Sequence, residues 1–238
     1  MNEHTVKSYD AEFSEIDRTT AQMGGLAETL LADAFAALER RDPALAEKAV
    51  VSDRAIDQLE HQLQERAIVM IAKRQPMAND LRHIMTVMKI AGDLERIGDL
   101  AKNIAKRAMA VSRESTPEPL MSGLRHMTEL AQRQLKDVLD ALSALSAEKA
   151  LLVWRSDASL DALYNSVFRE LLTYMMEDPR NIGLCTHLLF GAKNIERIGD
   201  HTTNIAENVY FLVTGSTIAD DRPKSDDTST IFISRPPQ

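Results

Sequence analysis

One segment of this chain occurs twice, once in each half. Residues 93–105 read Asp-Leu-Glu-Arg-Ile-Gly-Asp-Leu-Ala-Lys-Asn-Ile-Ala, and residues 194–206 read Asn-Ile-Glu-Arg-Ile-Gly-Asp-His-Thr-Thr-Asn-Ile-Ala. A repeat that preserved only a fold would mainly keep its apolar spacing, whereas these copies also share Glu-Arg-Ile-Gly-Asp and a following Asn. The chain is therefore an internal duplication, and the retained carboxylates point to a function that is present twice.

The composition favours helices over strands. Only 5% of the 238 residues are aromatic, and the chain holds just nine Gly and eight Pro beside abundant Ala, Leu and Glu. The hydrophobic content of 44% is ample for a buried core. We therefore expect an all-α protein with no sheet.

The positions of proline and of apolar residues divide each half into three helices. Apolar residues recur at steps of three and four in the first of them, and Asp42-Pro43, Pro76 and Pro117 mark helix starts. The predicted helices cover about residues 8–40, 43–74, 76–112, 117–146, 148–177 and 179–213. The expected fold is two tandem, pseudo-symmetric three-helix bundles at 1–112 and 120–215, with a linker at 113–119 and a disordered tail at 216–238.

Charge and cysteine content exclude several classes of protein. The net charge of −8 would repel nucleic acid and anionic lipid, so neither is an expected partner. Cys185 is the lone cysteine and cannot form an intramolecular disulfide, and the first twenty residues carry no signal-peptide-like apolar run. No apolar run approaches the roughly 20 residues of a membrane span. We expect a cytoplasmic protein without direct membrane insertion.

Acidic residues four positions apart occur in the second and third helix of each half. Such pairs project from adjacent turns of one helix face, and like charges at this spacing destabilise an isolated helix by roughly 0.2–0.5 kcal/mol. A compensating cation is therefore expected, and all-oxygen ligands suit Mg²⁺, Mn²⁺, Ca²⁺ or Fe. The candidate metal ligands are Asp53, Asp57, Glu95 and Asp99 in the first half and Asp157, Asp161, Glu196 and Asp200 in the second.

The alternative is that these carboxylates form solvated salt bridges with neighbours such as Arg96 and Lys102. His201 is a candidate extra ligand, although a solvent-exposed imidazole is the commoner role. Gly98 and Gly199 are expected at close helix contacts. The sequence holds no phosphate-binding Gly-rich loop, no Gly-x-Ser-x-Gly and no Glu-x-x-His, so it offers no candidate catalytic residue.

Two further segments complete a resemblance to a known family. Residues 74–82, Arg-Gln-Pro-Met-Ala-Asn-Asp-Leu-Arg, and residues 172–178, Leu-Thr-Tyr-Met-Met-Glu-Asp, together with the two Glu-Arg-Ile-Gly-Asp copies, resemble the PhoU family over about residues 1–215. The resemblance implies multinuclear metal clusters of Fe, Zn, Mn or Mg, held by the eight carboxylates named above. Asn194 stands where the first copy has Asp93, so a role for that position is not carried over to the second half.

The resemblance also implies a non-enzymatic function. A PhoU-type protein is expected to couple the ATPase subunit of the phosphate-specific ABC transporter to the PhoR sensor kinase, and to repress the phosphate-starvation response when phosphate is plentiful. It is further expected to form a homodimer, for which Met121, Met127, Met175 and Met176 are candidate contacts, although core is the commoner role for such residues. Two alternatives stay open: a metal-cluster enzyme such as a phosphohydrolase, and a metal-free helical adaptor.

Overall fold

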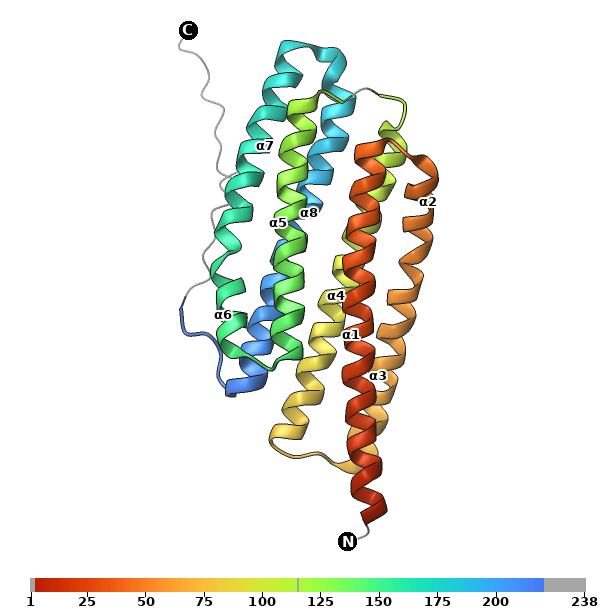
Figure 1. Ribbon diagram of the computed structural model, residues 1–238, viewed down its shortest axis with the longest axis vertical. Helices are drawn as coiled ribbons and strands as arrows, with labels where there is room; N and C mark the ends of the chain where they lie inside the picture. Colours follow the sequence, from red (N-terminus) through yellow and green to blue (C-terminus); the bar gives the residue numbers. More distant parts are fainter. Residues whose placement is uncertain (1–2, 115, 221–238) are drawn as a thin grey trace.

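The computed structural model describes residues 3–114 and 116–220, and over these ranges the chain consists of helices and their connections, with no strand (Figure 1). The prediction of an all-α fold is confirmed. Residues 216–220 carry no helix. The rest of the tail that was predicted to be disordered, residues 221–238, lies outside the described residues.

The first half contains α1 (Glu3–Arg40), α2 (Pro43–Ser52), α3 (Arg54–Arg74) and α4 (Asn79–Val111). The side chain of Asp42 caps α2 by accepting hydrogen bonds from the backbone N–H groups of Ala44 and Leu45. Pro43 occupies the first helical position, where its missing N–H would have no partner in any case. The helix start predicted from Asp42-Pro43 is thus observed.

The second half repeats this order with α5 (Glu118–Ser143), α6 (Ala147–Arg155), α7 (Asp157–Glu177), a 3-10 turn η1 (Pro179–Asn181) and α8 (Ile182–Thr214). Ser146 caps α6 through its hydroxyl, which accepts a hydrogen bond from the N–H of Lys149. Gly215 ends α8 in the left-handed conformation, with φ 75°. Each half is therefore three rods, of which the middle rod is divided into two helices.

The division of the middle rods differs from the sequence prediction, which placed uninterrupted helices at 43–74 and 148–177. Both breaks fall at a Ser-Asp pair in the same repeat position, Ser52-Asp53 and Ser156-Asp157. The Ser52 hydroxyl bonds the carbonyl of Lys48, and the Ser156 hydroxyl bonds that of Val153. Ser and Asp side chains compete with the helical ladder for backbone groups, which is the physical reason for a break here.

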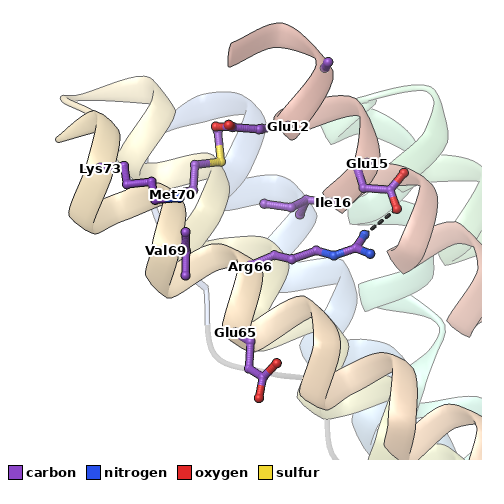
Figure 2. A pocket seen from close by; sticks show the side chains of 9 residues that line it. Glu12, Glu15, Ile16, Glu65, Arg66, Val69, Met70 and Lys73 are labelled. Carbon is purple, nitrogen blue, oxygen red and sulfur yellow. Dashed lines mark hydrogen bonds and ion pairs between the residues drawn. The ribbon is translucent and has the colours of Figure 1, made fainter. Parts of the chain in front are cut away.

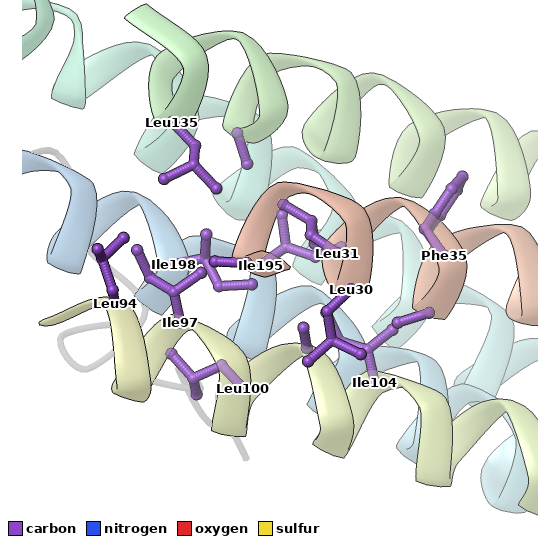
Figure 3. Packing of buried hydrophobic residues seen from close by; sticks show 14 of the residues in the cluster. Leu30, Leu31, Phe35, Leu94, Ile97, Leu100, Ile104, Leu135, Ile195 and Ile198 are labelled. Carbon is purple, nitrogen blue, oxygen red and sulfur yellow. The ribbon is translucent and has the colours of Figure 1, made fainter. Parts of the chain in front are cut away.

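The two long helices that carry the repeated motif, α4 and α8, run antiparallel and form the seam between the halves (Figures 1 and 3). Leu94 and Ile97 of α4 meet Ile195 and Ile198 of α8 in this seam (Figure 3), and all four side chains have no exposed surface. Helix α1 packs along the other side of α4. The apolar positions of the repeat therefore build the shared core, while Glu95 and Asp99 of α4 lie near the carboxylates of the middle rod.

Close helix contacts occur at the glycine of each repeated motif, as expected. A Cβ atom at Gly98 would lie 2.9 Å from Cδ1 of Ile56 on α3, and one at Gly199 would lie 2.4 Å from Cδ2 of Leu160 on α7. The absence of a side chain thus sets how near each middle rod approaches the seam helices.

Replacing Gly199 by valine is expected to lower the free energy of unfolding by about 1–3 kcal/mol, because the new side chain overpacks the contact with Leu160. Gly191→Val is the matched control, since Gly191 is buried in the same helix but a Cβ there would meet no heavy atom within 4 Å. Urea unfolding of both variants tests this. If both variants lost the same free energy of unfolding, the position of α7 would not depend on Gly199.

Glu28 of α1, which lies near Asp140 of α5, is expected to make the stability of the protein depend on pH. Burial, and then repulsion from Asp140, raise the pKa of Glu28, whereas Lys136 lowers it. The folded state therefore binds more protons than the unfolded state between the ordinary Glu pKa of about 4.3 and the raised folded pKa. This contribution to stability is present at low pH and is lost as the pH rises through the folded pKa.

In the variant Glu28→Gln this group no longer titrates, so stability should fall less between about pH 4.5 and pH 7 than it does in the parent chain. The measurement is urea unfolding at the two pH values, with the exposed Glu148→Gln as control. A parent and a Glu28→Gln variant with the same pH slope would contradict the expectation.

Candidate functional site

The four predicted ligands of the first half face one another across the contact of the middle rod with α4. Asp53 lies at the junction of α2 and α3 and is only 2% exposed, and Asp57 follows one turn later on α3. Glu95 and Asp99 lie half-buried on successive turns of α4. The break in the middle rod thus places Asp53, the most buried of the four, beside the α4 pair.

A lysine occupies the position between two of these carboxylates. The ammonium of Lys102 lies 2.5 Å from Oδ2 of Asp53 and 2.5 Å from Oδ1 of Asp99. The other oxygen of Asp53, Oδ1, is buried and accepts no hydrogen bond. Lys102 therefore supplies one positive charge to the cluster and ties α4 to the start of α3.

The pKa shifts show that the four carboxylates lie within electrostatic reach of one another. Burial raises the pKa of Asp53; Lys102 opposes the rise, and Asp57 and Asp99 add to it. Burial followed by Asp99 raises the pKa of Glu95, with Asp57 among the further causes. Burial acts to lower the pKa of Lys102, but its hydrogen bonds to Asp53 and Asp99 outweigh this and raise it. The cluster is therefore crowded with negative charge that one ammonium only partly balances.

The second half holds its carboxylates more deeply. Asp157, Asp161 and Glu196 are each at most 5% exposed, and Asp200 is half-buried. The hydroxyl of Thr203, which stands at the repeat position of Lys102, donates a hydrogen bond of 2.9 Å to Oδ1 of Asp157. The two clusters thus have the same types of acidic residue at corresponding repeat positions. They differ in the residue that approaches the first Asp.

A different lysine reaches the second cluster. Lys193 pairs with Glu196 at 2.9 Å, and its ammonium also lies 4.9 Å from the ring centroid of Tyr164 on α7. The repeat position of Lys193 in the first half is Gly92. Each half therefore brings one lysine to its carboxylates, from opposite ends of the motif.

The solvated salt bridges of the alternative interpretation are also observed in the first half. Arg96 lies 3.4 Å from Glu95 and 3.6 Å from Asp99, but its side chain is 61% exposed, so these pairs contribute little. In the part of the chain that the structure describes, no three Asp, Glu, His or Cys side chains are grouped so that they hold a metal ion as they stand. Metal binding by the eight carboxylates stays a prediction.

Sequence reasoning missed a polar network that joins the two halves. Asp93 of α4 lies 2.9 Å from Nδ1 of His201 and accepts a 3.4 Å hydrogen bond from the amide of Asn204, both on α8. The ring of His201, a candidate extra ligand, thus contacts the other half. The signal in the sequence was the difference between Asp93 and its repeat counterpart Asn194, which breaks the symmetry of the motif.

A groove between α1 and α3 was also not predicted from the sequence. It has a volume of about 610 Å³, and Ile16, Val69 and Met70 form its apolar surface (Figure 2). Arg66 reaches across it to Glu15. The charged residues that line the groove include both acidic and basic side chains.

The remaining sequence candidates divide between core and surface. Cys185 is buried, and burial raises the pKa of its thiol, in agreement with a core role. Met121 and Met127 are buried, whereas Met176 is exposed. No helix within residues 3–114 and 116–220 is long and apolar enough to cross a membrane.

Duplicated three-rod bundles with an acidic cluster in each half define a class of helical proteins, and the comparisons identify the family. The chain matches the family model described as the PhoU domain twice, over residues 20–108 and 124–209. The chain belongs to the PhoU family. The predicted duplication and family are thereby confirmed.

Similar proteins from bacteria cover this chain almost completely. It is 55% identical over 228 residues to a phosphate-specific transport system accessory protein PhoU homolog of Rhizobium meliloti (strain 1021), with 96% of each chain covered. It is 49% identical to the homolog of Caulobacter vibrioides (strain NA1000 / CB15N), over 95% of this chain and 98% of the relative.

Two solved structures share the fold. The crystal structure of PhoU from Pseudomonas aeruginosa matches with a TM-score of 0.85 and 38% identity, and covers 87% of this chain and 100% of that one. The phosphate transport system regulatory protein PhoU from Streptococcus pneumoniae matches with a TM-score of 0.81 and 28% identity, over 88% and 99%. As a member of the PhoU family, this chain is an accessory protein of the phosphate-specific transport system.

Proposed function

We propose that this chain couples the ATPase subunit of the phosphate-specific transporter to a PhoR-type sensor kinase, and represses the phosphate-starvation response when phosphate is plentiful. The observation that carries the proposal is the retention of the same acidic cluster in both halves of a chain whose relatives are named accessory proteins of phosphate transport. We propose a regulatory role without catalysis, in the cytoplasm and as a homodimer.

Exposed apolar residues at the two ends of the molecule support a role in protein contacts. Met77 lies in the connection just before α4, Leu81 and Met85 follow it at four-residue steps on the first turns of α4, and Met77 is 80% exposed. Met176 and Ile182 are exposed at the corresponding turn between α7 and α8. Grouped exposed apolar residues mark interaction sites, and methionine adapts to different partner surfaces.

We further propose that the two acidic clusters hold metal ions, of Fe, Zn, Mn or Mg. The residues fit such a group: the donors are all carboxylate oxygens, and Oδ1 of Asp53 is buried without a hydrogen-bond partner. Asp53, Asp57, Glu95 and Asp99 would hold the ions in the first half, and Asp157, Asp161, Glu196 and Asp200 in the second. When bound, the ions supply the positive charge that these crowded carboxylates need.

The test is a strain that lacks this chain and carries a reporter for the phosphate-starvation response. The reporter should be active in high phosphate and silent again when the parent chain is restored. The double variant Met77→Asp/Leu81→Asp should restore repression poorly and recover less transporter ATPase and kinase in a pulldown. Leu152→Asp, an exposed apolar position on α6, is the matched control. Repression that is unaffected by deleting the chain would refute the proposed function.

The alternatives are tested on purified protein. Turnover of a phosphoester by the metal-loaded chain, lost in Asp99→Asn, would favour the phosphohydrolase. A chain that binds none of the four metals by elemental analysis, yet still restores repression, would favour the metal-free adaptor.

A further inference from the structure

A second groove lies between the two halves, at the end of the bundle where α8 ends. Its volume is about 470 Å³, and apolar side chains of α4, α5 and α8 form its floor: Val87, Leu139, Leu142 and Leu212. A neighbouring hollow at the start of α4 shares Leu145, Leu212 and His83 with it, so the two form one continuous groove. An extended segment of several residues would be needed to fill it.

Leu145 stands between the two parts of this groove. It lies in the turn between α5 and α6, is 53% exposed and has a left-handed backbone with φ 46°. Its repeat counterpart, Arg41, has the same backbone conformation with φ 56° but carries a charged side chain. The second half therefore has an apolar side chain, which lines the groove, at the repeat position where the first half has an arginine.

The edge of the groove is acidic. Asp17, Glu28 and Asp140 line it, and Arg18, which also lines it, is paired with Glu15. Asp17 contacts His83 at 2.6 Å. Burial and then the nearby charge of Asp140 raise the pKa of Glu28, and Lys136 opposes this rise. The groove thus combines an apolar floor with an edge that attracts a basic group.

The chain outside the described residues contains a segment of matching chemistry. Residues 221–230 are polar, and Ile231-Phe232-Ile233 follows them, with Arg235 two positions later. Leu212, which lines the groove, lies on the last turns of α8, and the described chain continues from there to Asp220. Eleven residues can span up to about 36–40 Å, so Ile231 is within reach of the groove.

We propose that this groove is the docking site of the chain's own C-terminal segment, with Ile231-Phe232-Ile233 on the apolar floor and Arg235 at the acidic edge. The apolar triplet covers Leu145, and the guanidinium approaches Asp140 and Glu28. The inference does not depend on the regulatory function proposed above.

The experiment is disulfide trapping in the full chain. Leu145→Cys/Phe232→Cys is oxidised under mild conditions at low protein concentration, and the linked species is quantified by mass spectrometry; Cys185 is buried and does not compete. Leu152→Cys/Phe232→Cys is the control, because it uses the same tether and a somewhat more exposed leucine outside the groove. Docking predicts that the 145–232 bond forms at least about tenfold faster within one chain, since proximity raises the effective concentration.

A third variant tests the acidic edge. Adding Asp140→Lys to Leu145→Cys/Phe232→Cys should slow formation of the disulfide several-fold, because it places a like charge beside Arg235. Equal rates for the 145 and 152 pairs would overturn the proposal, as would a 145–232 bond that forms only between two chains. Insensitivity to Asp140→Lys would refute the contact of Arg235 with the acidic edge.

Discussion

Replacing Lys102 by threonine is expected to lower the free energy of unfolding by about 3 kcal/mol in metal-free buffer. Asp53 is 2% exposed and Lys102 is its hydrogen-bonded cation, so the change leaves a buried carboxylate without its ion pair. The estimate is at the lower end of the range for such a loss, because Lys102 keeps some contact with solvent. The variant places in the first half the residue type that Thr203 has in the second.

Thermal or urea unfolding measures the loss, with Lys106→Thr, an exposed lysine on the same helix, as the matched control. If the acidic clusters bind metal, adding Fe, Zn, Mn or Mg should restore part of the stability of Lys102→Thr, since a ligand at 100 times its dissociation constant adds about 2.7 kcal/mol. Chelator should return the variant to its metal-free midpoint. A variant as stable as the control would show that Asp53 does not need Lys102.

Replacing Leu94 by alanine is expected to lower the free energy of unfolding by about 2–5 kcal/mol. Leu94 has no exposed surface and lies in the seam where α4 meets α8 (Figure 3). Loss of its side chain therefore leaves a cavity between the halves as well as removing apolar contact. Ile195→Ala, at the corresponding position of α8, should cost a similar amount.

Leu152→Ala is the control for this prediction, because Leu152 is 62% exposed and its truncation should change stability by less than about 0.5 kcal/mol. Equilibrium unfolding in urea distinguishes the outcomes. A single transition that moves as a whole in Leu94→Ala would show that the halves unfold together. Two separate transitions would show that the seam holds together two independently stable halves.

Most of the fold was predictable from local signals. The start of α2 follows from Asp42-Pro43, because capping depends on residues next to one another in the chain. The breaks in the middle rods were not predicted, since Ser and Asp also occur inside uninterrupted helices and only packing decides the outcome. Confirmation of the duplicated fold rests on the two PhoU domain matches and on the solved PhoU structures.

The sequence names the carboxylates of the candidate site, whose metal binding stays a prediction, but it does not indicate which cations approach them. Once the segment is helical, the four-residue spacing alone places Glu95 and Asp99 on one face of the helix. Which cation reaches them depends on side chains from other turns and other helices. Lys102 in the first half and Lys193 in the second occupy different repeat positions, so no single spacing rule connects them with the carboxylates.

The sequence by itself determined the helical class and the duplication, and it named eight acidic residues as candidate ligands, because each follows from composition, from periodicity or from a repeat along the chain. Tertiary structure alone decided that Asp53 is buried beside Lys102, that Asp93 binds the opposite half and that α4 and α8 share one core. The physical reason is that these contacts join residues far apart in the chain, whose proximity is set by how the rods pack and not by any local preference.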